Sequence, residues 1–228
     1  MSGSRLLVLG ISTAGSAEVA LSNDGTDIVR AGAAGALELV AAFVDEAVAA
    51  ANATLNDVAL IGVCTGPGSF TGLRIGVAFA KTLAQTLGVP IAGISTYDVV
   101  TFGNAVYPVI AVARGKKDHY YARVTASEDG DPRFVQGSHA EIERAASEFN
   151  VSNGKAVILG QDFSTVRPGD AARAVVALAR QAHARAEALD WPNITVDYGQ
   201  RPNAVLNWER RLAGREGRPV SRREPSGE

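Results

Sequence analysis

The sequence is poor in cysteine, aromatic residues and net charge, and each shortage excludes a class of protein. Cys64 is the only cysteine among 228 residues, so neither an intrachain disulfide nor a cysteine-based zinc site can form, and a reducing compartment is expected. Aromatic residues make up 6%, too few for a platform that stacks single-stranded nucleic acid. The net charge of −2 is unlike the strongly basic balance of a protein that coats a polyanion.

Long apolar runs are also absent. Near the N-terminus only six residues of apolar type follow one another, from Leu6 to Ile11, whereas a membrane span needs about 20. A signal peptide likewise needs a longer apolar stretch. We therefore expect a cytoplasmic protein that does not associate with a membrane.

What the chain does have is an ordinary globular composition, with 46% hydrophobic and 20% charged residues. In the first half, apolar runs alternate with amphipathic stretches, and Asn23-Asp24-Gly25 favours a hairpin turn. The pattern predicts strands at 5–11, 18–21, 27–31, 58–64 and 91–94, and helices at 36–51 and 71–87. The chain therefore opens as a three-stranded meander.

The second half repeats this alternation. Ser138 and Glu141 match a capping box, which predicts the start of a helix. The further elements predicted are strands at 108–113, 120–126 and 156–159, and helices at 139–149 and 170–189. Strands interspersed with helices argue for an α/β protein built in layers.

The predicted organisation has two lobes and a tail. We divide the chain into an N-terminal lobe at 1–103, a smaller C-terminal lobe at 104–208 and a flexible tail at 209–228. The tail holds six arginines and four acidic residues, with glycine and proline among them. A solvated tail is the favoured interpretation, and contact with RNA is the alternative.

The most informative segment lies between a predicted buried strand and a helix. It reads Gly66, Pro67, Gly68, Ser69, Phe70, Thr71, Gly72, Leu73 and Arg74. Ser69 or Thr71 can cap the helix, and free backbone N–H groups there would attract an anion or contact a partner. The glycine spacing fits neither the dinucleotide-binding fingerprint nor a Walker loop, so a structural tight turn is equally compatible.

The two helices of the first half carry more apolar surface than one sheet can cover. In each, apolar residues span roughly 200° of arc, whereas a helix on one sheet needs about 100°. Gly72, Gly76 and Ala80 recur every four residues and predict a smooth groove for another helix. Either a second protein covers these faces or the helices cover each other. The residues predicted to face a partner are Leu37, Val40, Phe43, Val44, Val48, Ile75, Gly76, Phe79, Ala80 and Leu83.

The segment from Gly66 to Arg74, continued by Ile75-Gly76-Val77, closely resembles the hallmark of the bacterial TsaB (YeaZ) family, sometimes labelled glycoprotease-like. The resemblance runs from Leu6 through Thr96, thins after about residue 125, and returns loosely at 198–202. It implies the actin, Hsp70 and sugar-kinase fold, which is ribonuclease H-like, with two related lobes and a mixed sheet flanked by helices.

The resemblance also implies a function. The expected role is a non-catalytic scaffold or dimerisation subunit that binds a TsaD-like subunit through its N-terminal helices, and with it a TsaE-like ATPase. Together they transfer threonylcarbamoyl to the adenosine 3′ of the anticodon in tRNAs that read ANN codons. In isolation such a subunit pairs with a second copy of itself.

The chain departs from the family at two places. Gly10-Ile11-Ser12-Thr13 lacks the acidic residue that usually ends the first strand, and no histidine precedes the first long helix. His119, His139 and His183 lack ligand spacing. We therefore expect no metal, no cofactor and no catalytic residue.

Other catalytic arrangements are not supported. Ser69 does not lie in a G-x-S-x-G elbow, Cys64 is expected to be a buried and unreactive thiol, and Asp45 and Glu46 fall on a solvated helix face. The alternatives are an independent phosphotransferase or hydrolase that uses 66–72 for phosphate, or a self-contained homodimer.

Overall fold

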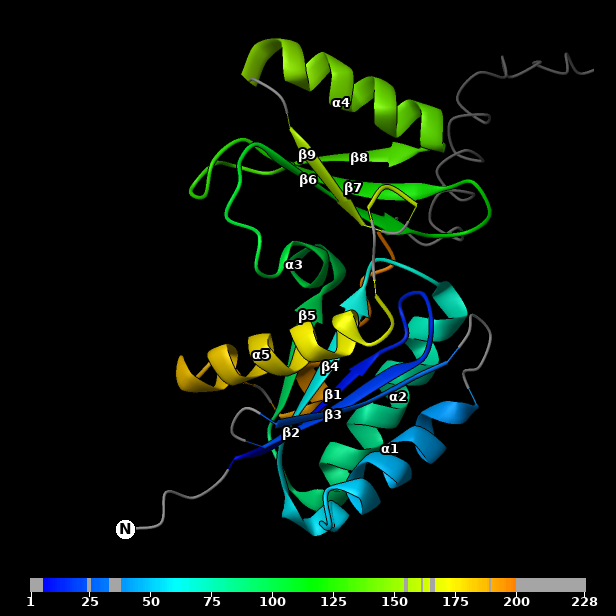
Figure 1. The fold of residues 1–228 in the computed structure, drawn as a ribbon, viewed down its shortest axis with the longest axis vertical. Coiled ribbons are helices and arrows are strands. Elements are labelled where there is room, and N and C mark those ends of the chain that lie inside the picture. The colour runs from blue at the N-terminus through cyan, green and yellow to red at the C-terminus, as the bar shows by residue number, and fades with distance from the viewer. Residues whose placement is uncertain are drawn as a thin grey trace, which may run out of the picture.

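The computed structural model describes residues 6–23, 26–32, 38–153, 156–160, 162–164, 167–188 and 190–199. Two sheets, each flanked by helices, lie one above the other (Figure 1). The predicted tail at 209–228 lies outside the described residues. Within them, no helix combines the length and the apolar character needed to cross a bilayer.

The first sheet has five strands in the order β3-β2-β1-β4-β5. They are β1 (Leu7–Ser12), β2 (Glu18–Asn23), β3 (Thr26–Ala31), β4 (Val58–Gly66) and β5 (Ile91–Ser95). The first three form an antiparallel meander, and β4 and β5 run parallel to β1. Strands β1 and β4 are almost wholly buried because helices cover both faces of the sheet.

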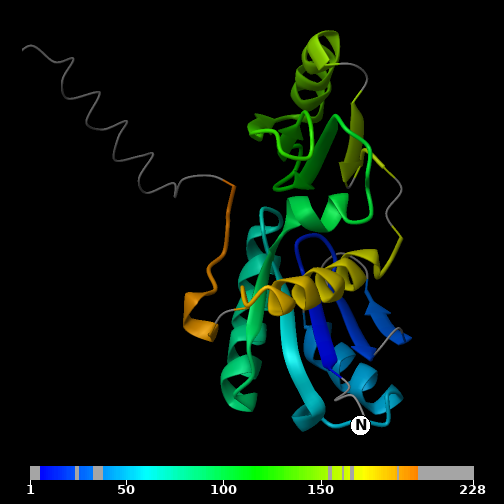
Figure 2. The same ribbon diagram turned by 90° about the vertical axis from the view of Figure 1, so that its left-hand side faces the viewer.

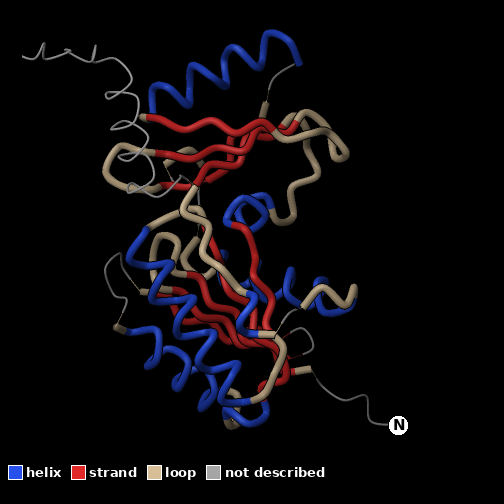
Figure 3. The backbone as a smooth tube through the Cα atoms, turned by 180° about the vertical axis from the view of Figure 1, so that it is seen from behind, coloured by secondary structure: helices blue, strands red, loops and turns tan. Residues whose placement is uncertain are grey.

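Helices α1 (Leu39–Ala50) and α2 (Phe70–Leu87) lie side by side on one face of this sheet (Figures 1 and 3). Helix α1 packs on β2 and β3, and α2 packs on β4 and β1. The opposite face is covered by α5 (Asp170–Ala184), whose buried residues pack on β1 and β4. A short 3₁₀ helix, η1 (Leu55–Asp57), leads from α1 into β4.

The second sheet has four strands in the order β8-β7-β6-β9. They are β6 (Val109–Arg114), β7 (Tyr120–Thr125), β8 (Arg133–Gly137) and β9 (Val157–Gly160). Helix α4 (His139–Asn153) covers the outer face, and α3 (Thr96–Thr101) lies on the inner face (Figure 1). The predicted capping box forms, because Glu141 Oε2 accepts from the Ser138 N–H at 2.8 Å.

The two lobes repeat one plan: a three-stranded meander, a helix, and a strand parallel to the first. This confirms the predicted α/β architecture of the actin-like, ribonuclease H-like class. Helix α3 follows β5 but packs on the second sheet, whereas α5 follows β9 but packs on the first. The division at residue 103 stays a prediction, since the packing of these two helices crosses it.

The segment 190–199 runs from a second 3₁₀ helix, η2 (Trp191–Asn193), along the outer side of α2 (Figure 2). Lys81 Nζ donates to the Ile194 carbonyl at 2.8 Å, and the Asp197 N–H donates to the Thr65 carbonyl at 2.8 Å. Ile194 is buried in the hydrophobic core of the first lobe. The chain thus returns to the end of β4, where the predicted functional loop begins.

Candidate functional site

The loop between β4 and α2 is a tightly packed turn. Ser69 Oγ accepts from the Gly72 N–H at 3.3 Å and is the N-cap of α2, while Thr71 is exposed. The Ser69 N–H donates to the Ala14 carbonyl at 2.7 Å, which ties the loop to the turn after β1. Two N–H groups that an anion would use are therefore occupied, and this supports the structural-turn interpretation.

The predicted glycine groove on α2 is filled by the protein itself. A Cβ added at Gly72 would collide with the Thr13 carbonyl oxygen, and one added at Gly76 would collide with Thr13 Oγ1. The glycines allow the end of β1 to approach the helix, as glycine does where backbones pass closely. The prediction that another helix occupies this groove is therefore wrong.

Five of the predicted partner-facing residues lie in the core of their own lobe. Val40, Val44, Val48 and Ala80 are between 0% and 7% exposed, and Gly76 is buried beneath Thr13. Their assignment to an interface is corrected, because each packs on the first sheet or the turn after β1. The predicted 200° arc included these buried residues together with the apolar residues on the outer side of the helices, although the first sheet already covers the buried ones. Leu37 lies outside the described residues.

The other predicted residues on these two helices are partly exposed. Ile75 is 38% exposed, while Phe43, Phe79 and Leu83 are half-buried. Leu39, at the start of α1, is also 38% exposed. We call these residues, Leu39, Phe43, Ile75, Phe79 and Leu83, the apolar patch. They lie on α1 and α2, the two helices on which a partner was predicted to dock.

Phe70 and Arg74 lie on the side of α2 that faces the 190–199 segment. The Phe70 ring is 47% exposed, and its centroid lies 4.8 Å from that of Tyr198. Arg74 Cζ lies 5.4 Å from the same ring centroid, in cation–π range. These two exposed side chains of the loop motif therefore help to hold the returning chain against α2.

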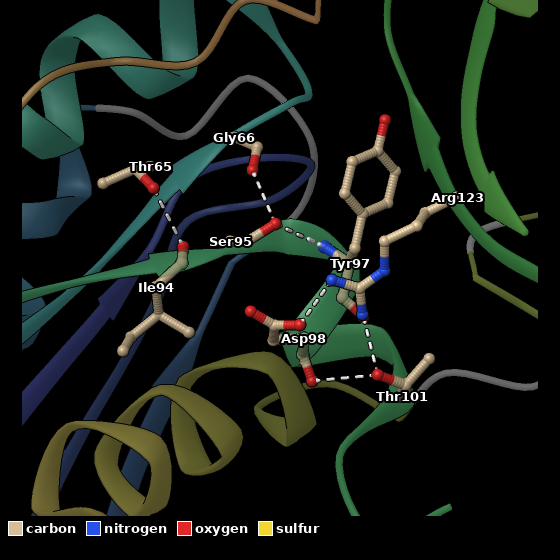
Figure 4. Close-up of polar contacts among 8 residues, drawn as sticks. All are labelled: Thr65, Gly66, Ile94, Ser95, Tyr97, Asp98, Thr101 and Arg123. Carbon is tan, nitrogen blue, oxygen red and sulfur yellow. Dashed lines mark hydrogen bonds and ion pairs between the residues drawn. The ribbon is translucent and has the colours of Figure 1, made fainter. Parts of the chain in front are cut away.

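Polar contacts connect this loop to the second lobe (Figure 4). Ser95 Oγ donates to the Gly66 carbonyl at 3.5 Å and accepts from the Tyr97 N–H at 3.2 Å. Arg123 of β7 pairs with Asp98 at 2.7 Å and lies 5.4 Å from the Tyr97 ring centroid. The start of α3 is thus the joint between the lobes.

A cleft of about 330 Å³ lies between the lobes and is lined by Ser12, Glu18, Cys64, Pro67, Arg114 and Arg167, among others. Among the described residues that line it, only Glu18 carries a carboxylate. Ser16 Oγ donates to Glu18 Oε1 at 3.1 Å, and the Ala172 N–H donates to Glu18 Oε2 at 3.3 Å. The carboxylate therefore caps the first turn of α5, where a bound anion would otherwise be stabilised.

Glu18 is the residue of this cleft that sequence reasoning missed. It is 5% exposed and begins β2, where its side chain reaches across to α5. An acidic residue at the head of an otherwise apolar strand is the local signal. Its role depends on Ala172, 154 positions further along the chain.

Cys64 is fully buried, as predicted, and its Sγ lies 3.1 Å from Thr96 Oγ1. Burial raises the pKa of this thiol above its ordinary value of 9.0, because burial disfavours the thiolate. Its contribution to stability is therefore present below about pH 9 and falls as the pH rises, since only the unfolded chain then ionises.

We expect Cys64 to react with a thiol reagent at least about 100-fold more slowly in the native protein than in urea, because only the exposed thiol forms a thiolate. Ellman's reagent at pH 8 measures both rates. Equal rates would contradict the buried, protonated thiol.

Two of the histidines make ring contacts, and His183 is exposed on α5. His139 stacks on Phe163 with centroids 4.3 Å apart, and His119 meets Tyr121 edge-on at 4.9 Å. Across the described ranges no three His, Cys, Asp or Glu side chains are grouped as metal ligands. Asp45 and Glu46 are exposed, and Glu46 pairs with Arg30 at 2.9 Å.

The fold and the loop motif define a two-lobed actin-like protein, and a family model described as TsaD, tRNA N6-adenosine threonylcarbamoyltransferase, matches residues 34–167. Since this is more than half of the chain, the protein belongs to that family. The chain is also similar to proteins named TsaB or YeaZ.

Two curated relatives and one solved structure illustrate this. TsaB of Bacillus subtilis, described as a tRNA threonylcarbamoyladenosine biosynthesis protein, is 40% identical over 65 residues, 26% of this chain and 28% of that protein. A tRNA N6-adenosine threonylcarbamoyltransferase of Geotalea uraniireducens is 35% identical over 91 residues, 37% of this chain and 26% of that protein. The match thus spans under a third of either relative.

The structure of YeaZ from Pseudomonas aeruginosa superposes with a TM-score of 0.64. It covers 85% of this chain and 99% of that chain at 19% identity. At this identity the likeness shows the fold alone.

Proposed function

We propose that this protein acts in tRNA threonylcarbamoyladenosine formation as a non-catalytic scaffold. It binds a TsaD-like subunit through α1 and α2, and with it a TsaE-like ATPase, in the cytoplasm. The complex transfers threonylcarbamoyl to the adenosine 3′ of the anticodon in tRNAs reading ANN codons. Family membership and the relatives' described roles support the pathway.

The observation that carries the scaffold role is the partly exposed apolar patch on α1 and α2, formed by Leu39, Phe43, Ile75, Phe79 and Leu83. Apolar side chains left exposed on neighbouring helices are typical of a protein interface. A second copy of this chain offers the same patch, so a homodimer is the competing occupant when the subunit is alone.

The side chains that could take part in catalysis are held in structural contacts, and this supports a non-catalytic role. Ser69 caps α2, Glu18 caps α5, and burial keeps the Cys64 thiol protonated. Each group is occupied by a structural contact. An independent phosphotransferase would need Glu18 free to orient a metal–phosphate group.

Replacing Ile75 by aspartate is expected to weaken binding to a TsaD-type subunit at least about 30-fold, because a charge in the centre of an apolar interface loses 2 kcal/mol or more. Ile75 is 38% exposed, so the variant should fold like the wild type. Gln85→Asp, on an exposed part of the same helix, is the matched control. Isothermal titration calorimetry measures both dissociation constants.

Sedimentation of the variants alone and with the TsaD-type subunit shows whether that subunit or a second copy of this chain covers the apolar patch. We expect that Ile75→Asp does not form the heterodimer, whereas Gln85→Asp forms it normally. If Ile75→Asp and Phe79→Asp both bind with wild-type affinity, the patch is not the interface.

A further inference from the structure

A second hollow, of about 290 Å³, lies at the joint between the lobes, and its lining shares no residue with the apolar patch or the interlobe cleft. Its lining includes Tyr97 of α3, Tyr121 of β7, Phe134 of β8 and Asp197 of the 190–199 segment. Gln136 of β8 completes the polar part of the wall. Four separate segments therefore bring three aromatic rings and one carboxylate together.

The floor of this hollow consists of two buried tyrosines. Tyr97 is 6% exposed and Tyr121 is 5% exposed. Neither hydroxyl has a hydrogen-bond partner among the described residues. Burial, and then the charge of Asp197, raises the pKa of both phenols, so both are neutral at physiological pH. Each hydroxyl oxygen is available as an acceptor.

The rim carries an open ring and an open carboxylate. Phe134 is 65% exposed and its ring lies 5.8 Å from that of Tyr97. Asp197 Oδ1 accepts from the Gly199 N–H at 2.8 Å, and no cation in the described part of the chain pairs with this carboxylate. The nearby Arg123 is paired with Asp98 instead.

We propose that this aromatic pocket binds an arginine side chain presented by a protein partner. A guanidinium is planar, stacks on aromatic faces, and carries five donors and no acceptor. It would stack on Phe134, pair with Asp197 and donate to a tyrosine oxygen. A phosphate or a nucleic-acid backbone would be repelled by Asp197, and an aliphatic side chain would leave the carboxylate and hydroxyls unpaired.

The test is an NMR titration of the full chain with N-acetyl-L-argininamide, with the neutral isostere N-acetyl-L-citrullinamide as the ligand control. Saturable shifts of the Tyr97 and Tyr121 resonances are expected with the arginine compound and not with citrulline. Asp197→Asn, which keeps an acceptor for the Gly199 N–H, and Phe134→Ala should each weaken binding about threefold or more. The matched controls are Asp190→Asn and Phe102→Ala, exposed residues that do not line the pocket.

Several outcomes overturn the proposal. Equal binding of the two ligands removes the role of charge, and full binding by Asp197→Asn and Phe134→Ala removes the role of the pocket. Arg201 follows Gly199 closely in the sequence. If the arginine compound binds the Arg201→Ala variant but not the wild-type protein, Arg201 of the same chain occupies the pocket and no partner is needed.

Discussion

Replacing Gly66 by alanine is expected to lower the free energy of unfolding by about 3 kcal/mol. Gly66 has φ of +115°, a conformation that L residues with a side chain rarely adopt. A Cβ there would also collide with the Asp197 carbonyl oxygen and lie 2.9 Å from Leu73 Cδ1. The first glycine of the loop motif therefore lets the 190–199 segment cross the end of β4.

Gly103→Ala is the matched control for this experiment. Gly103 has φ of +77°, but a Cβ built there meets nothing within 4 Å. Its replacement should lower the free energy of unfolding by only about 1 kcal/mol, because alanine is less stable than glycine in this backbone conformation. Urea unfolding of both variants followed by circular dichroism gives the two free energies.

The difference between the two variants isolates the contact with the 190–199 segment. In Gly66→Ala the segment has to shift, which breaks the bond from the Asp197 N–H to the Thr65 carbonyl and separates Tyr198 from Phe70. We therefore also expect faster proteolysis within 190–199. Equal losses for Gly66→Ala and Gly103→Ala would mean that the segment does not press on Gly66.

The regular elements could be predicted because each has a local signal. Apolar runs predicted strands β1 and β4, and a capping serine with a following glycine stop predicted α2. Helix α3 and strand β8 were missed. Helix α3 reads Thr-Tyr-Asp-Val-Val-Thr, whose β-branched residues favour a strand, but packing between the lobes and the Ser95 cap make it a helix.

The candidate sites could be predicted only where they are contiguous. The loop from Gly66 to Arg74 has a recognisable pattern, whereas the aromatic pocket combines Tyr97, Tyr121 and Asp197 from distant segments. Helical periodicity predicted which residues form the apolar arc but not which other parts of the chain pack on them. It could not say that a sheet, Thr13 and Ile194 cover part of that arc.

Replacing Gly76 by alanine is expected to lower the free energy of unfolding by about 2 kcal/mol, although alanine is the better helix former by about 1 kcal/mol. The sign follows from Thr13, whose Oγ1 an added Cβ would strike and whose Cγ2 lies 3.0 Å away. Close packing leaves no room for an extra methyl group there. Ala78→Val, on the exposed side of the same helix, adds side-chain volume without this contact.

A double-mutant cycle with Thr13→Ala gives the decisive measurement. Thr13 Oγ1 is buried without a hydrogen-bond partner in the described part of the chain, so Thr13→Ala breaks no hydrogen bond and should lower stability only by the lost burial of the Cγ2 methyl group, about 1 kcal/mol. In the double variant the added methyl group occupies the space that the hydroxyl leaves. The free energy of unfolding should then return to within about 0.5 kcal/mol of the wild type, which gives a coupling energy of about 2 to 3 kcal/mol.

The opposite result would restore the groove that the sequence suggested. If Gly76→Ala is neutral or stabilising, and its effect adds to that of Thr13→Ala, then Thr13 does not press on α2. The face of Gly72, Gly76 and Ala80 would then be open to the helix of another protein, and the partner surface would extend beyond Ile75 and Phe79.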